Sequence, residues 1–85
     1  MPIFLIVDNL PQPFFDDELK NAFEPFGRVV SARLVRDNYG EPLGFGFVEL
    51  ETDEPARVIS NLNGRTIRGQ HIVVSLLQPP PIGHA

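Results

Sequence analysis

The segment Gly44-Phe45-Gly46-Phe47-Val48-Glu49-Leu50 determines how the whole chain is interpreted. Successive side chains of a β-strand point to opposite faces, so Phe45 and Phe47 share one face of this segment. The opposite face carries Gly46, Val48 and Leu50. Aliphatic side chains are typical of a face that packs against helices, which leaves the two phenylalanines on a face exposed to solvent. A pair of exposed aromatic rings indicates a surface that a ligand covers.

The remaining sequence predicts the elements around this strand. Further strands are expected over residues 3–7, 28–36 and 71–77, because apolar or alternating runs there are bounded by turn residues. One helix is expected to begin at Asp16 and to end before Gly27. A second helix is expected to follow Thr52 as its N-cap and to end at Asn63-Gly64, with Ile67 in a short connector. The order βαββαβ predicts an α+β, ferredoxin-like split βαβ sandwich, in which two helices cover one face of a four-stranded antiparallel sheet.

Length and composition favour one small domain. The chain has 85 residues, of which 42% are hydrophobic, and we expect the domain over residues 1–78 and a flexible Pro-rich tail over residues 79–85. It contains no cysteine, so disulfides and cysteine-based zinc sites are excluded. No apolar run approaches the roughly 20 residues that cross a bilayer, so we expect no membrane partner. An intracellular location, nuclear or cytoplasmic, fits this composition.

The charge balance is unusual for a nucleic-acid-binding protein. Seven basic residues stand against eleven acidic ones, which gives a net charge of -4, and no basic run is present. Phosphate neutralisation supplies much of the affinity of most such proteins. Unpaired bases are nevertheless natural covers for exposed rings, because base–aromatic stacking contributes about 1–3 kcal/mol per base. The glycines beside the two rings are expected to leave room for a base to approach.

The strand sequence resembles a known family. Residues 43–50 are similar to the eight-residue motif K/R-G-F/Y-G/A-F-V-x-F/Y of RNA-recognition-motif domains and match five of its seven specified positions. Residues 5–10 resemble the family's six-residue motif on the first strand. Residues 26–37 and 62–64 resemble the family's second strand and the end of its second helix. The resemblance covers about residues 3–77 and implies binding of single-stranded RNA on the open face of the sheet.

Two departures from the family pattern bear directly on RNA binding. Leu43 stands where the family usually has a Lys or Arg that contacts phosphate, and Ile6 stands where an aromatic ring usually stacks on a base. Asp8 and Glu49 are expected on or beside the same face, where they repel phosphate. We therefore expect binding to depend on stacking more than on charge.

The expected RNA contacts are distributed over several strands. Two successive bases are expected on Phe45 and Phe47, with Ile6 packed against a base or ribose and Arg33 supplying a positive charge. Three further candidates are Asn9, His71 and Ser75. The alternative role of Asn9 is to close its loop through its side chain, and His71 and Ser75 are expected to share the open face with Val73. Single-stranded DNA is a second candidate ligand, and a monomer is expected.

A protein-binding role on the same fold is the alternative. Some splicing-factor relatives of the family capture a peptide tryptophan with an acidic first helix and an Arg-x-Phe segment after the second helix. Here the first helix is expected to carry Asp16, Asp17, Glu18 and Glu24, and Arg65-Thr66-Ile67 occupies the corresponding segment. Ile67 replaces the phenylalanine, and the preserved Gly-Phe-Gly-Phe-Val favours RNA.

An enzyme is the least favoured class. The sequence has no phosphate-cradling Gly-Lys motif and no His–carboxylate cluster at metal-ligand spacing. His71 and His84 are too far apart in the sequence to suggest a metal site. We therefore expect no catalytic residue, no metal and no cofactor.

Overall fold

The computed structural model describes residues 1–77 of the chain. Residues 78–85, which include the predicted Pro-rich tail, lie outside the described residues. The elements follow in this order: β1 (Pro2–Asp8), α1 (Asp16–Phe23), the 3-10 turn η1 (Glu24–Phe26), β2 (Arg28–Arg36), β3 (Pro42–Glu51), α2 (Pro55–Leu62), β4 (Thr66–Ile67), β5 (Gln70–His71) and β6 (Val73–Leu76). This arrangement confirms the predicted βαββαβ core.

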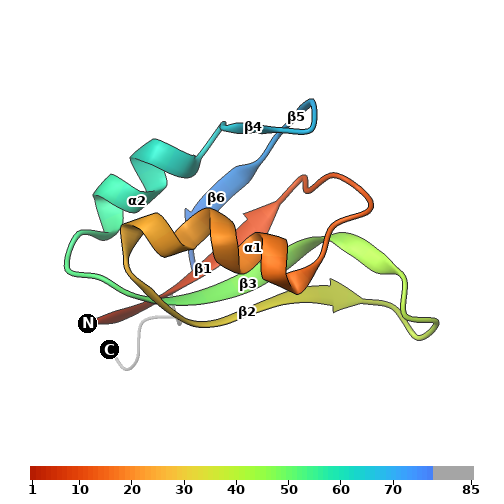
Figure 1. Cartoon of the computed structure of the whole chain (residues 1–85), viewed down its shortest axis with the longest axis horizontal. Helices are drawn as coiled ribbons and strands as arrows, with labels where there is room; N and C mark the ends of the chain where they lie inside the picture. Colours follow the sequence, from red (N-terminus) through yellow and green to blue (C-terminus); the bar gives the residue numbers. More distant parts are fainter. Residues whose placement is uncertain (78–85) are drawn as a thin grey trace, which may run out of the picture.

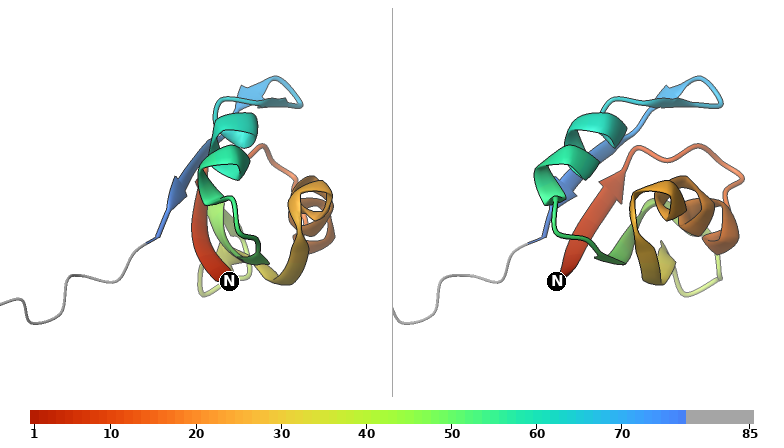
Figure 2. Two further views of the ribbon diagram at one scale, coloured as in Figure 1. Left: turned by 90° about the vertical axis from the view of Figure 1, so that its left-hand side faces the viewer. Right: turned by 60° about the vertical axis from the view of Figure 1, so that its left-hand side comes forward.

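Four strands form one antiparallel sheet in the order β2-β3-β1-β6. Figure 1 views the molecule from the side of the helices, with α1 and α2 in front of the strands. Figure 2 shows from two other directions that both helices lie on one side of the sheet. The opposite face, which we call the open face, carries these side chains: Phe4, Ile6, Asp8, Ser31, Arg33, Val35, Phe45, Phe47, Glu49, Val73 and Ser75.

The core lies between the sheet and the helices. Its members come from alternate strand positions and from the inner helix faces: Leu5, Val7, Leu10, Phe14, Leu19, Phe23, Leu34, Val48, Leu50, Val58, Leu62, Ile72 and Val74. Val48 and Leu50 are fully buried, which confirms the face assigned to them from the alternation. The burial of apolar surface is the main source of stability for such a fold. Each Å² of apolar surface removed from water contributes about 25 cal/mol.

Both edge strands of the sheet receive a side-chain acceptor. The backbone N–H of Leu34 on β2 donates to Asp16 Oδ1 at 2.9 Å. The backbone N–H of Val74 on β6 donates to Asn63 Oδ1, also at 2.9 Å. An edge strand otherwise leaves such groups unpaired. These bonds therefore tie the start of α1 and the end of α2 to opposite edges of the sheet.

Gly46 allows α1 to approach the sheet closely. A Cβ atom built at Gly46 would lie 2.6 Å from the carbonyl oxygen of Arg33 and 3.1 Å from Cδ2 of Leu19. Gly46 is buried on the helix side of β3. The expectation that this glycine leaves room for a base is therefore wrong, because the space beside it is filled by the second strand and the first helix.

Three local predictions differ from the structure. Thr52 is not the N-cap of α2: Glu54 holds that position and Pro55 begins the helix, while Thr52 Oγ1 accepts a hydrogen bond from the Glu54 N–H at 3.1 Å. The connector at Ile67 is strand β4, which pairs with β5 in a separate two-stranded sheet. The fourth strand of the main sheet is therefore shorter than residues 71–77, because its first residues belong to this hairpin.

Candidate functional site

One row of side chains crosses all four strands of the open face. In the strand register, Arg33 lies opposite Phe47, Phe47 opposite Ile6, and Ile6 opposite Ser75. We call these four residues the central row. Adjacent strands are about 4.8 Å apart, so the row extends over roughly 14 Å. Tertiary pairing thus brings together four of the residues predicted from sequence, although they come from four separate segments of the chain.

The two phenylalanines of β3 meet edge to face. Their ring centroids are 6.0 Å apart and the ring planes are inclined by 83°. Phe47 is 39% exposed, whereas Phe45 is partly buried. An edge-to-face arrangement is favourable for the ring pair itself. However, two bases stacked flat on both rings would be inclined to each other by the same angle, so the rings do not form one continuous stacking surface.

Phe4 is a further aromatic residue of the open face, and it was not among the predicted contacts. It is 49% exposed and alternates along β1 with the fully buried Leu5. That alternation was visible in the sequence, where Phe4 has the same parity as Ile6. The family motif on this strand begins at Leu5, so the motif does not include Phe4 and gives it no role in RNA binding.

Asn9 is engaged within the fold. Its φ of 58° lies in the left-handed region, where asparagine is among the better-tolerated residues. Its side-chain Nδ2 donates to the carbonyl oxygen of His71 at 2.9 Å, and its own carbonyl accepts from Gln70 Nε2 at 3.1 Å. These bonds join the loop after β1 to strand β5, so the loop-closing interpretation describes its geometry.

His71 does not join the row formed by Ser75. It lies on β5, opposite Thr66, and not on the main sheet. Its ring Nδ1 is 3.1 Å from the carbonyl oxygen of Gly64 and 3.2 Å from Thr66 Oγ1. The prediction that His71 shares the open face with Val73 and Ser75 is therefore wrong, because the hairpin turns this residue toward the end of α2.

Charge on the open face is mixed. Arg33 is exposed at one end of the central row, and it forms no ion pair with another residue in the described part of the chain. Asp8 and Glu49 occupy the same face on the neighbouring central strands. Leu43 is 52% exposed where a cation would otherwise stand. The face is therefore apolar and aromatic at its centre, with positive charge concentrated on β2.

The helix side is organised around Arg68. Its guanidinium binds the Glu18 carboxylate and the Pro13 carbonyl, and it lies 5.4 Å from the centroid of the Phe14 ring. The other Glu18 oxygen accepts the Phe15 N–H at 3.1 Å at the start of α1. The Glu18 carboxylate is thus already occupied. This arrangement removes Glu18 from the acidic surface that the peptide-binding alternative needs, whereas Asp17 and Glu24 stay exposed and form no ion pair among residues 1–77.

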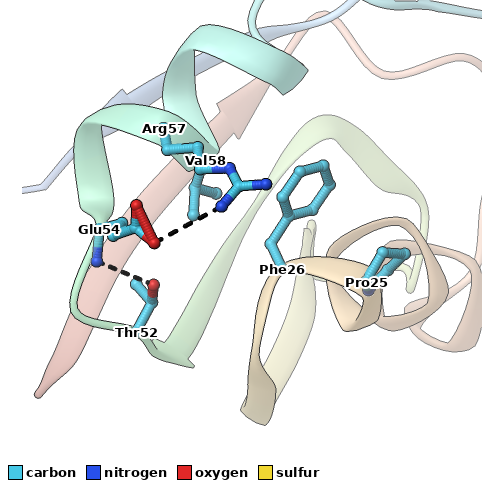
Figure 3. Close-up of a pocket in the computed structure, with 6 residues that line it drawn as sticks. All are labelled: Pro25, Phe26, Thr52, Glu54, Arg57 and Val58. Atoms are coloured by element: carbon cyan, nitrogen blue, oxygen red, sulfur yellow. Dashed lines mark hydrogen bonds and ion pairs between the residues drawn. The ribbon is translucent and has the colours of Figure 1, made fainter.

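A pocket of about 140 Å³ lies between η1 and the start of α2. Figure 3 shows its lining residues, with the Glu54–Arg57 ion pair at 3.5 Å along one side: Pro25, Phe26, Thr52, Glu54, Arg57 and Val58. The pocket is away from the central row and from the Arg65 segment. Residues 1–77 contain no group of three His, Cys, Asp or Glu side chains suited to a metal ion, and neither helix has the length and apolarity needed to span a membrane.

Comparison with known proteins agrees with this geometry. Residues 5–73 match the family model described as RNA recognition motif. The MKI67 FHA domain-interacting nucleolar phosphoprotein of Danio rerio is 36% identical over 84 residues, which cover 98% of this chain and 31% of that protein. The cytoplasmic and nuclear polyadenylate-binding protein of Eremothecium gossypii is 39% identical over 75 residues, covering 87% of this chain and 13% of that protein.

A solved structure of the Sxl-lethal protein/RNA complex has the same fold. Its TM-score is 0.84 at 33% sequence identity, and the match covers 96% of this chain and 50% of that chain. The chain therefore spans about half of this solved chain and less than a third of the two relatives above.

Proposed function

The chain belongs to the RNA recognition motif family, and on this premise we propose that it binds single-stranded RNA across the open face of its sheet. The central row carries the proposal, because it places an aromatic ring between a cation on one side and an apolar side chain on the other. The RNA in the complex of the Sxl-lethal protein, a relative in fold and sequence, supports the choice of ligand. The function is binding, without a catalytic step.

A base stacks on Phe47 in this proposal. Phe47 is the more exposed of the two β3 rings and lies at the centre of the row. Ile6 packs against the same base or the adjoining ribose, and the Ser75 hydroxyl supplies a hydrogen-bonding group beyond it. Phe45 is inclined by 83° to Phe47, so it contacts a ribose or the edge of a base. This division of roles replaces the expectation of two bases lying side by side on both rings.

Electrostatic attraction contributes little to this binding. Arg33 is the cation of the central row, whereas Asp8 and Glu49 repel phosphates near them. Each phosphate neutralised on a single strand contributes about 0.7 to the slope of log affinity against log salt concentration. We therefore expect a shallow salt dependence. A steep slope would show that cations outside the open face carry the binding.

The test is a titration of the labelled domain with short single-stranded RNA at low salt, followed by amide chemical shifts. Wild-type shifts are expected to centre on the central row. Phe47→Ala is expected to weaken binding by about 1–3 kcal/mol, because it removes one stacking contact. The variant is expected to stay folded, since the ring is partly exposed and contributes to the surface more than to the core.

Phe15→Ala is the matched control. Phe15 is 57% exposed and precedes α1, so its loss removes an exposed ring away from the central row. Its RNA affinity is expected to equal that of the wild type. Equal affinity in Phe47→Ala would contradict the proposal. Shifts confined to α1 and Arg65 on addition of a tryptophan-containing peptide, with none on addition of RNA, would favour the protein-binding alternative.

Several wider properties are also proposals. We expect a deoxyribose strand of the same sequence to bind as well, because stacking does not require the 2′-hydroxyl, and we expect the domain to act as a monomer. The two relatives named above are described as nucleolar and as cytoplasmic and nuclear. We therefore propose an intracellular location, nuclear or cytoplasmic.

A further inference from the structure

A second row of side chains crosses the open face beside the central row. Ser31 lies opposite Glu49, and Glu49 lies opposite Phe4. On the far side of Phe4, the Leu77 N–H donates to the Phe4 carbonyl at 2.8 Å, which places Leu77 next in line. We call these four residues the second row.

The apolar half of this row, Phe4 and Leu77, is exposed to solvent in the structure of residues 1–77. Phe4 is 49% exposed and Leu77 is 44% exposed; Phe4 lies on β1, and Leu77 directly follows β6, the strand paired with β1. Neither residue belongs to the central row. Two adjacent, exposed apolar side chains of this size form a surface on the sheet. A planar, apolar group that stacks on this surface is stabilised.

Glu49 determines what the planar group must offer at its edge. An ionised carboxylate only accepts hydrogen bonds, and its two oxygens accept from two parallel donors. Glu49 forms no ion pair with another residue among residues 1–77. It therefore repels a phosphate and favours a group that presents N–H donors.

Guanine fits this requirement better than the other bases. Its Watson–Crick edge presents N1–H and the N2 amino group side by side, which match the two oxygens of one carboxylate. Adenine and cytosine present one donor beside an acceptor on that edge, and uracil presents one donor between two acceptors. Side chains directly opposite each other on neighbouring strands have Cβ atoms about 4.5–5.5 Å apart, so a base stacked on Phe4 brings its edge to Glu49.

We propose that Phe4 and Glu49 form a guanine-selective subsite, in which the base stacks on Phe4 and its Watson–Crick edge donates two hydrogen bonds to Glu49. This inference rests on the proposed function, since it requires single-stranded RNA on the open face. It assigns the base preference to the second row, and general stacking to the central row.

The experiment uses a short oligouridine with one central guanosine, and the same strand with inosine, adenosine, cytidine or uridine at that position. Inosine keeps N1–H but lacks the N2 amino group. The wild-type domain is expected to bind the guanosine strand about fivefold to a hundredfold more tightly than the adenosine or uridine strand, in line with the discrimination of a bidentate contact. The inosine strand is expected to bind with intermediate affinity.

Two variants separate the contributions of the ring and the carboxylate. Glu49→Gln is expected to lose the guanosine preference while binding all-uridine RNA at least as well as the wild type, because a repulsive charge is gone. Phe4→Ala is expected to weaken binding of the guanosine strand. Glu24→Gln on η1 and Phe15→Ala serve as matched controls on other surfaces, and both are expected to keep the preference. Amide spectra of every variant check that the fold is intact.

The outcomes distinguish this subsite from the proposed function. Equal wild-type affinity for the guanosine and adenosine strands, or a preference that survives in Glu49→Gln, would overturn the subsite. A stronger preference for cytidine would overturn the choice of guanine. If all-uridine RNA still bound and Phe47→Ala weakened it, the proposed function would stand without the subsite. If no RNA bound at all, both would fall.

Discussion

Replacing Gly46 with alanine tests how closely α1 and β2 approach the functional strand. The new Cβ atom would lie 2.6 Å from the Arg33 carbonyl oxygen, 3.1 Å from Leu19 Cδ2 and 3.2 Å from Leu34 Cα. Ordinary contacts between carbon atoms are about 3.5–4.0 Å. Two of the three nearest atoms belong to the backbone of the paired strand, so a side-chain rotation cannot relieve the contact.

The expected cost of Gly46→Ala can be estimated from two opposing terms. Overpacking of this kind costs about 1–3 kcal/mol. The loss of glycine flexibility in the unfolded chain offsets about 0.4–1 kcal/mol, since φ of Gly46 is not in the left-handed region and alanine can adopt it. These two estimates combine to a net loss of unfolding free energy of about 0–2.6 kcal/mol, and the close contact with a backbone oxygen, which cannot rotate away, favours the upper half of this range. A domain of this size is expected to have about 4–13 kcal/mol in total.

Urea denaturation followed by far-ultraviolet circular dichroism measures this loss. Thermal unfolding provides a second measurement: for a loss of about 1.5 kcal/mol, Tm is expected to fall by roughly 6–12 °C. Gly46→Val is expected to lose more than Gly46→Ala, because two further methyl groups enter the same space. Ser31→Ala on the exposed side of β2 is the control and is expected to change stability by less than about 0.5 kcal/mol. Wild-type stability in Gly46→Ala would refute the reasoning, because it would show that the strand and helix are not in close contact at this residue.

Three other changes test the open face and the hairpin. Ile6→Phe places an aromatic ring beside Phe47 and is expected to tighten RNA binding by part of the about 1–3 kcal/mol of a full stacking contact, because the ring replaces the existing packing of Ile6; an unchanged affinity in the titration would mean that the centre of β1 does not contact a base. Leu43→Arg adds a cation beside the stacking rings and is expected to steepen the salt slope by about 0.7, whereas an unchanged slope would place that side chain away from phosphate. Arg68→Ala removes an ion pair and a cation–π contact and is expected to lower the unfolding free energy by about 1–2 kcal/mol and to speed amide exchange in β4 and β5. Arg65→Ala, as its control, is expected to change both little, and equal effects of the two variants would argue against a specific role for Arg68.

Alternation along one segment was enough to predict the chemistry of β3. Because side-chain direction on a strand follows from covalent geometry, the sequence alone placed Phe45 and Phe47 on one face of β3 and Val48 and Leu50 on the other face. The same reasoning assigned Ile6 and Arg33 to the open face, and the order of elements predicted the sheet and its two helices. Phe4 was available to the same argument, but it lies one residue outside the family motif.

The tertiary structure decided which of these residues are neighbours. That Arg33, Phe47 and Ile6 form one row depends on the register between strands far apart in the sequence, and no local pattern contains that register. The 83° angle between the two β3 rings likewise depends on rotamers chosen by packing. Alternation already placed Gly46 on the face of Val48 and Leu50, but only the fold shows how closely the Arg33 backbone and the Leu19 side chain approach it.

The hairpin shows the same division between local and long-range information. The sequence of residues 71–77 alternates well enough to predict one continuous strand, yet His71 pairs with Thr66 and Asn9 bonds to its carbonyl. Those contacts join segments separated by up to 62 residues. The sequence by itself determined which side chains can stack and which face they occupy, because both follow from local backbone geometry. The structure alone decided the row in which they meet, because pairing and packing between distant segments determine register.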